Sequence, residues 1–364
     1  MGVRANRVRQ RVGVIAAIGL GSIALAACGS PSGKPHSTST LPPLPPEVYG
    51  IVTLIGGGAS AGTGASAERI ALTSVPPELL PATKVGTFPD AVAIAPDQKT
   101  AYVTSYQSGT VTPINLSNGK AEKPIAVGRG PAGIAITPNG KMAYVTDAGS
   151  SPIGDTVTPI NLKTDRPGRP ITVGEGPQAI AITADGTMAY VTDAGAIVTG
   201  QTGAIGDTVT PIDLATNKAM PPITVGNGPV AIAIAGANAY VANSGSESVS
   251  PIDLSARTVG AAIAVPGAPQ SIAIRGNTAW VALGHTTISP GNSLVPIDLS
   301  TDTAGTPVAV GRQPSAVAIS GNKAWVVCAS SIVPVTLSRQ PAAGKPVSIA
   351  GGPYALALYL FRPR

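Results

Sequence analysis

Short apolar segments with a period of two recur along the chain, and polar turns rich in Gly, Pro, Asn and Asp separate them. In one segment Ile134 and Ile136 alternate with two small residues, the pattern of a strand that packs one face on a core. One complete unit contains four such segments, at residues 130–137, 142–147, 155–162 and 170–174. Each unit therefore predicts four short strands joined by turns.

A proline opens each copy of this unit, at Pro89, Pro131, Pro177, Pro229, Pro269, Pro314 and Pro353. The successive spacings are 42, 46, 52, 40, 45 and 39 residues. A repeat of this length with four strands is typical of a propeller blade. The sequence therefore predicts an all-β fold, a seven-bladed β-propeller of four-stranded antiparallel blades.

The seventh copy is incomplete, because only one strand and a short tail follow Pro353. A single strand would leave an open edge. Residues 47–86 contain the missing segments, which we assign to 48–52, 70–75 and 80–86. We expect these N-terminal strands to pair with the C-terminal strand and close the ring, so that residues 47–364 form one propeller.

Three further positions repeat within the unit. An aromatic residue recurs in the second segment, where we expect it to pack between blades: Tyr102, Tyr144, Tyr190, Tyr240, Trp280 and Trp325. A proline recurs in the third, where its missing N–H must not be needed: Pro113, Pro159, Pro211, Pro251 and Pro296. A polar residue follows it and favours a turn over a metal site: Asn115, Asn161, Asp213, Asp253 and Asp298.

The second segments read Tyr102-Val-Thr-Ser, Tyr144-Val-Thr-Asp, Tyr190-Val-Thr-Asp and Tyr240-Val-Ala-Asn. With the downstream Pro-Ile-Asp-Leu and Val-Gly-x-Gly-Pro segments, they resemble the YVTN β-propeller repeat family over about residues 85–358. The resemblance implies the propeller fold. The fifth and sixth units depart from it, with Trp280-Val-Ala-Leu and Trp325-Val-Val-Cys, so it says less about function.

Residues 1–27 have the form of an export signal: a basic start, then the uncharged stretch from Val12 to Ala27, which is short for a membrane span. The stretch ends in Leu25-Ala-Ala-Cys28, which resembles the bacterial lipobox and implies that Cys28 carries acyl chains such as palmitate. The alternative is an ordinary cleaved signal with an incidental cysteine. Residues 28–46, with the lipidated cysteine and a Pro/Ser-rich segment, are interpreted as a tether.

These segments predict a lipoprotein anchored in the cell membrane and facing outside the cytoplasm. The net charge of +6 does not argue against this, because Arg4, Arg7, Arg9 and Arg11 all lie in the signal. The remaining 20 basic and 18 acidic side chains leave +2, with no basic run in the body. A nucleic-acid partner is therefore not expected.

Chemistry-bearing residues are few. Cys28 and Cys328 are the only cysteines, and we interpret Cys328 as a small buried residue rather than a reactive thiol. His36 and His285 with scattered carboxylates form no zinc pattern, and a catalytic triad around His285 is not favoured. We predict no catalytic residues, no metal and no cofactor.

Function is expected where variable loops meet a rigid scaffold. The second and third strands of several blades are joined by long segments: 53–67, 147–155, 193–207 and 283–293. On the same face, the variable position after each opening proline should ring the mouth of the channel. The polar or aromatic residues there are the candidate binding residues, with unconstrained surface as the alternative: Asp90, Gln178, Gln270, Ser315 and Tyr354.

We therefore expect a monomeric binding or interaction scaffold rather than an enzyme, with an envelope protein or a glycan as its partner. The alternative is a propeller hydrolase such as a lactonase, with its site at the channel mouth. A calcium-dependent site of that kind needs converging carboxylates and amides, and only Asp90, Gln178 and Gln270 could supply them.

Overall fold

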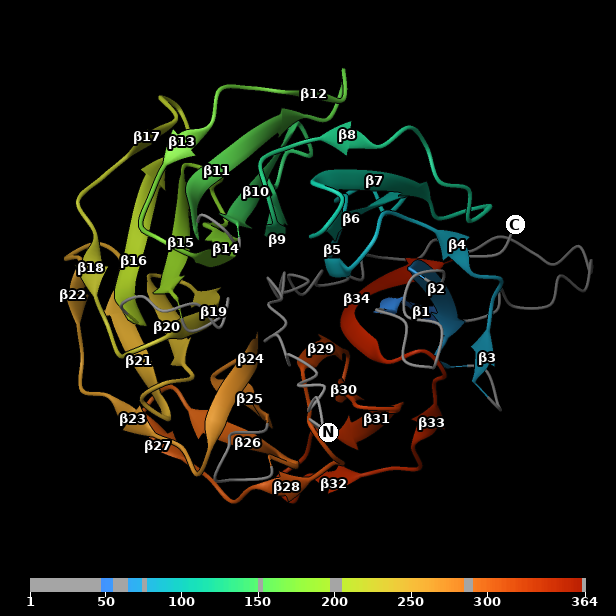
Figure 1. Cartoon of the computed structure of the whole chain (residues 1–364). Coiled ribbons are helices and arrows are strands. Elements are labelled where there is room, and N and C mark those ends of the chain that lie inside the picture. Colours follow the sequence, from blue (N-terminus) through green and yellow to red (C-terminus); the bar gives the residue numbers. More distant parts are fainter. Residues whose placement is uncertain are drawn as a thin grey trace, which may run out of the picture.

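The computed structural model describes residues 47–54, 65–73, 77–149, 153–196, 205–284 and 291–361. Its strands form seven antiparallel sheets arranged around a central axis (Figure 1). This confirms the predicted seven-bladed β-propeller. The described part of the chain contains no helix that is long and apolar enough to cross a membrane. The signal, Cys28 and the tether fall outside the described residues.

The blades are numbered from the first complete repeat, and their strands are given from the axis outwards. Blade 1 contains β5 (Pro89–Ile94), β6 (Thr100–Ser105), β7 (Thr110–Asn115) and β8 (Ile125–Ala126). Blade 2 contains β9 (Pro131–Ile136), β10 (Met142–Gly149), β11 (Ile153–Asn161), β12 (Arg166–Pro167) and β13 (Ile171–Thr172). Blade 3 contains β14 (Pro177–Ile182), β15 (Met188–Gly195), β16 (Ile205–Asp213), β17 (Lys218–Ala219) and β18 (Ile223–Thr224). Blade 4 contains β19 (Pro229–Ala235), β20 (Asn238–Asn243), β21 (Ser248–Asp253), β22 (Thr258–Val259) and β23 (Ile263–Ala264).

Blade 5 contains β24 (Ala268–Arg275), β25 (Thr278–Gly284), β26 (Ser293–Asp298), β27 (Thr303–Ala304) and β28 (Val308–Ala309). Blade 6 contains β29 (Ala316–Ser320), β30 (Lys323–Cys328), β31 (Ser331–Thr336), β32 (Ala342–Ala343) and β33 (Val347–Ser348). Blade 7 combines the two ends of the chain: β34 (Pro353–Phe361), β1 (Glu47–Leu54), β2 (Ser66–Ala71), β3 (Glu78–Leu79) and β4 (Thr83–Lys84).

The outer strand is split into two short pieces in blades 2 to 7, and in blades 2 to 5 the split lies opposite the repeated proline. Blade 7 is split in the same way opposite Arg69, so the split accommodates the proline but is not caused by it. In blade 2 both β12 and β13 pair with β11, on either side of Pro159. The carbonyl of Pro159 accepts a hydrogen bond from Gly168 N–H, so this residue turns its backbone toward the outer strand. The proline nitrogen points to the same side, where the outer strand is interrupted. No carbonyl of the outer strand therefore lacks a donor at this position. The missing N–H is therefore not needed.

Blade 7 closes as the sequence predicts, because β1 pairs with β34 from Glu47↔Phe361 to Leu54↔Pro353. In Figure 1 the red strand β34 lies beside the blue strands β1 and β2. Two details differ from the prediction. The third strand is Ser66–Ala71, upstream of the segment assigned to it. The aromatic position holds Ile51, which pairs with Ala357 as Tyr102 pairs with Ala93. Similar hydrophobicity at neighbouring residues concealed this register in the sequence.

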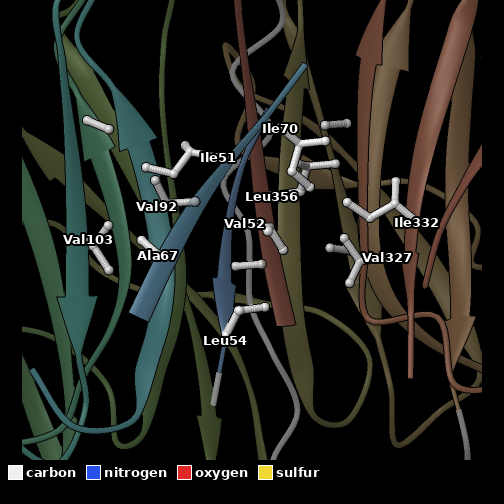
Figure 2. Close-up of a cluster of buried hydrophobic side chains, with 14 of the residues drawn as sticks. Ile51, Val52, Leu54, Ala67, Ile70, Val92, Val103, Val327, Ile332 and Leu356 are labelled. Carbon is white, nitrogen blue, oxygen red and sulfur yellow. The ribbon is translucent and has the colours of Figure 1, made fainter. Parts of the chain in front are cut away.

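The core lies between blades, because each sheet presents an apolar face to its neighbour. Tyr102 of blade 1 packs in one buried cluster with Ile134 and Ile136 of blade 2, and the other repeated aromatics occupy the equivalent interfaces. At the closure, Ile51 and Leu356 of blade 7 lie in one cluster with residues of blades 1 and 6 (Figure 2). The packing role predicted for the aromatics is confirmed.

A threonine at the end of the Tyr-Val-Thr segment joins neighbouring blades through hydrogen bonds. The inner strand β9 has a bulge that removes Gly133 N–H from the ladder. Thr146 Oγ1 accepts from this N–H at 2.7 Å and donates to the carbonyl of Gln178 in blade 3 at 2.9 Å. Thr104 makes the equivalent contacts with Ala91 of its own blade and Ala132 of blade 2. The repeated hydroxyl therefore satisfies two backbone groups that the bulges would leave unpaired.

The repeated Asn or Asp after the third strand forms a turn, as predicted. Asp213 Oδ1 accepts from the N–H groups of Ala215 and Thr216, and Asp253 Oδ1 accepts from those of Ser255 and Ala256. These are local side-chain caps of the backbone. The carboxylates at these positions therefore serve to cap the turn.

Candidate functional site

The two ends of the ring differ in construction. At one end, here called the turn face, lie the short turns from the first to the second strand and from the third to the fourth strand of each blade. At the other end, here called the loop face, lie the loops from the second to the third strand and the links between blades. Both ends of the body lie at the turn face, where Glu47 pairs with Phe361 and Leu360 N–H donates to Gln98 of a blade 1 turn.

On the loop face, two hairpins continue further than the sequence predicts. Residues 147–155 and 193–207 were expected to be loops. In the structure β10 and β11 pair as far as Gly149↔Ile153, and β15 and β16 as far as Gly195↔Ile205. The sequence suggested loops here because the ends of these strands contain glycines. A register shift in each hairpin also interrupts the regular alternation of the strands. Residues 150–152, 197–204 and 285–290, with His285, fall outside the described residues, as do 55–64 in blade 7.

The five candidate residues all lie where the inner strands begin, at the loop face. Asp90, Gln178, Gln270 and Tyr354 belong to β5, β14, β24 and β34, and Ser315 directly precedes β29. The inner strands form a closed ring of neighbours, so these residues share one level of the ring. The first four are buried, with 6%, 1%, 7% and 7% of their surface exposed. They are thus much less accessible than an open binding ring would require.

Two of these side chains hold neighbouring blades together. Gln270 Nε2 donates to Ser244 Oγ of blade 4 at 2.9 Å, and Ser315 Oγ donates to the carbonyl of Tyr354 in blade 7 at 2.9 Å. Gln178 differs, because its buried Nε2 has no hydrogen-bond partner. The ring positions therefore include structural contacts as well as an amide that could bind a ligand or water.

Two buried carboxyls that the sequence analysis did not single out lie just outside this ring. Asp147 in β10 and Asp193 in β15 are exposed by only 1% and 2%. Asp147 Oδ2 accepts from the hydroxyls of Thr158 and Thr156 at 2.6 and 3.2 Å, and Asp193 Oδ2 accepts equivalent bonds from blade 3. Burial raises the pKa of Asp147 to about 6 and that of Asp193 to about 7, although these bonds lower it. Oδ1 of each carboxyl has no hydrogen-bond partner.

The sequence signal for these carboxyls was the pairing of Tyr-Val-Thr-Asp with a downstream Asp-Thr-Val-Thr in the same two blades. Blade 4 has a neutral version, in which Asn243 Nδ2 donates to the hydroxyls of Ser248 and Ser250. Asn243 Oδ1 is again buried without a partner. Blades 2 to 4 therefore share a polar position that blades 5 and 6 fill with Leu283 and Cys328.

Two cavities open at this level of the molecule. One, of about 220 Å³, lies beside the blade 2 carboxyl, and its polar lining is Arg129, Asp147, Asp155 and Thr156. The other, of about 320 Å³, lies beside Cys328 and Arg312. Cys328 is buried, as predicted, and burial raises the pKa of its thiol to about 12. A thiol with so high a pKa is a poor nucleophile near neutral pH.

Within the described ranges, no group of three or more His, Cys, Asp or Glu side chains could hold a metal ion. The acidic residues of the loop face are instead spread along an arc. What this geometry can do is present carboxylates and buried acceptors to a ligand that supplies hydrogen-bond donors.

The fold defines the chain as a β-propeller, and structural comparison gives the same class. The chain is similar to a functionally unknown protein from Desulfotomaculum acetoxidans, with a TM-score of 0.67 and 16% identity over 87% of this chain and 99% of the other. It is also similar to Kuenenia stuttgartiensis hydrazine synthase, with a TM-score of 0.63 and 19% identity over 80% and 92%. A third structure is U3-55K, with a TM-score of 0.61 and 11% identity over 73% and 84%.

No family model matches the sequence, and no curated protein matches it. Identities this low show the fold alone, which many unrelated functions share. The propeller that the YVTN resemblance implies is confirmed, whereas membership of that family stays a prediction.

Proposed function

We propose that this protein is an exported lipoprotein, anchored in the cell membrane through Cys28, whose propeller acts as a binding scaffold through its loop face. One observation carries the proposal. The chain enters and leaves the body at the turn face, where Glu47 pairs with Phe361. An anchor attached upstream of Glu47 is therefore joined to the body at the end opposite the loop face.

The anchor follows from the signal and lipobox resemblance of residues 1–28. Acyl chains on one cysteine contribute roughly 0.8 kcal/mol for each buried CH₂ group, so several chains suffice for stable attachment. In a polyproline II conformation, the Pro/Ser-rich tether could extend to roughly 50 Å at about 3.1 Å per residue. The loop face is then accessible to a partner such as an envelope protein or a glycan.

Binding through the loop face is supported by how the propeller is built. The inner strands and the threonine contacts between blades hold the ring rigid, whereas the connections on the loop face vary from blade to blade. Variable connections on a rigid frame are the usual place for recognition. We expect the propeller to be a monomer, because each blade of the closed ring already packs against two neighbouring blades.

The test uses the full chain in a native bacterial envelope, with a photo-crosslinking side chain introduced at Glu175 on the loop face. The matched control carries it at Lys141 on the turn face. We expect a discrete protein or glycan product from position 175 and lipid or no product from position 141. Equal products from both positions, or none from either, would contradict the binding role.

The anchor is tested separately. Mass spectrometry of the mature N-terminus should find acylated Cys28, and Cys28→Ala should release the protein from the membrane fraction. An unmodified N-terminus, or a Cys28→Ala chain that remains bound to membranes, would contradict the lipoprotein assignment and leave the binding role to the crosslinking result.

A further inference from the structure

Four acidic residues follow one another along the loop face of blades 2 to 4, and we call them the acidic arc: Asp155, Glu175, Asp207 and Glu247. The first three are exposed and Glu247 is partly exposed. Asp155, Asp207 and Glu247 occupy the same position in successive blades, because their carbonyls accept equivalent bonds from the closing strand. That position is neutral in blades 1, 5 and 6, with Gly109, Asn292 and Ser330.

Backbone hydrogen bonds connect these positions into a continuous band. Gly176 N–H donates to Gly154, next to Asp155, and Gly195 N–H donates to the carbonyl of Glu175 itself. Glu175 therefore lies between the hairpins of blades 2 and 3. Gly228 N–H donates to Gly206, beside Asp207, and Gly245 N–H donates to Asn227. The same bonds thus lead on to blade 4 and Glu247.

From Glu175 to Glu247, the part of the band that the structure describes has no compensating charge. Between Ile153 and Pro269, the loop-face residues in the described ranges carry carboxyls and no Lys or Arg. Arg129 lines the cavity beside Asp147 and Asp155, at the blade 2 end of the band, whereas Arg312 lies further away, at the link before blade 6. The turn face mixes both signs, with Lys99 in the same turn as Asp97 and Lys141 in the equivalent turn of blade 2. The uncompensated negative charge is therefore concentrated between Glu175 and Glu247, on one face of the ring.

An independent feature beneath the band also points to a ligand with hydrogen-bond donors. Asp147 and Asp193 are almost completely buried, and each has one oxygen without a partner. Asp147 lines the cavity of about 220 Å³ that opens beside Asp155, together with Arg129. A buried acceptor without a partner costs roughly 1–3 kcal/mol unless a donor reaches it. An N–H donor that enters from the band would remove this cost.

From these features we infer that the acidic arc binds a basic polypeptide segment, whose lysine or arginine side chains contact Asp155, Glu175, Asp207 and Glu247. The ammonium or guanidinium donors would form charge-assisted bonds with the exposed carboxylates, and one could enter the cavity beside Asp147. This inference rests on the proposed function, because it assigns a partner chemistry to the same loop face. A basic segment of an envelope protein has the required charge.

The test measures the affinity of the mature chain for a fluorescent decalysine peptide by polarisation. The loop-face variant combines Glu175→Gln, Asp207→Asn and Glu247→Gln. The control variant combines Asp97→Asn, Asp165→Asn and Asp302→Asn, which removes the same charge from the turn face. Asp165 and Asp302 have positive φ values of 51° and 50°, a conformation that asparagine tolerates.

We expect the wild-type chain to bind the peptide, with an affinity that falls as salt rises. At about 20 mM salt the loop-face variant should bind about tenfold more weakly, and the control within about twofold of wild type. Spermine should compete weakly, because it offers fewer charges than the peptide. Equal losses in both variants, no loss in the loop-face variant, or spermine binding as tightly as the peptide would overturn the inference.

This result is separable from the proposed function. If position 175 yields crosslinked partners while the loop-face variant binds decalysine normally, the loop face binds something other than a basic segment. If no position is crosslinked in the envelope, the binding role itself fails, whatever the peptide shows.

Discussion

The threonine contacts between blades make a quantitative prediction about stability. Thr146 is completely buried, and its hydroxyl is the partner of both Gly133 N–H and the Gln178 carbonyl. Thr146→Val keeps the shape of the side chain and removes that hydroxyl. The bulge in β9 prevents the strand ladder from taking over the N–H. The substitution therefore leaves one buried donor and one buried acceptor without partners.

Each unsatisfied group costs about 1–3 kcal/mol, so the variant should lose about 2–6 kcal/mol of unfolding free energy. The unfolding entropy of about 2.1 cal/mol/K per residue, applied to residues 47–361, gives about 0.7 kcal/mol per degree. The Tm should therefore fall by about 3–9 °C.

The assay is calorimetric or circular-dichroism melting of the mature chain, with Thr172→Val as the matched control. Thr172 is exposed in β13, and its hydroxyl joins no two blades, so the control should stay within about 0.5 kcal/mol of wild type. Thr146→Ser retains the hydroxyl and should recover most of the loss. If Thr146→Val had the same Tm as Thr172→Val, the Thr146 hydroxyl would not be joining the blades and the reasoning would be refuted.

Three further predictions follow from the buried carboxyls, the closure and the thiol. Burial raises the pKa of Asp147 to about 6 and of Asp193 to about 7 from the ordinary 3.8, so the folded state holds these protons longer than the unfolded state. Their contribution to stability is fully present below about pH 4 and is lost as pH rises through 6 and 7, on the order of 3 kcal/mol for Asp147 and 4 kcal/mol for Asp193. Replacing both with Asn should flatten the fall in Tm between pH 5 and pH 8; an equally steep fall would contradict the assignment. Deleting residues 352–364 removes β34, and with it the buried Leu356 and Tyr359, so the melting temperature should drop sharply; an unchanged value would contradict closure by this strand. In an unacylated Cys28→Ser chain, Cys328 should react with a thiol reagent only as fast as the protein unfolds, and rapid reaction of the folded chain would show that the thiol is accessible.

Several parts of the fold could be predicted because they repeat. Tyr102 and its counterparts signalled an interface between blades, and the prolines of the third strand signalled positions where the N–H is not needed. Blade closure was also predictable, because a lone strand after Pro353 required partners from residues 47–86. What the repeat could not supply was the register within blade 7, where Ile51 rather than Tyr49 takes the aromatic position.

The candidate site was less predictable than the fold. The variable residues after the opening prolines do share one level of the ring, yet Gln270 and Ser315 are used in contacts between blades. Asp147 and Asp193 appeared in the sequence as part of a repeated motif, with nothing to show that they were buried. Burial and partner satisfaction depend on which neighbouring blade covers a side chain.

The sequence by itself determined the number of blades, the four-strand unit, the turn residues and the apolar strand positions that form the core. These depend on local periodicity and on the requirement that every strand edge be paired. Only the tertiary structure decided which polar groups lack partners, and that Asp155, Glu175, Asp207 and Glu247 form one band. Their positions in the chain differ by up to 92 residues, and closing blades against one another is what brings them side by side.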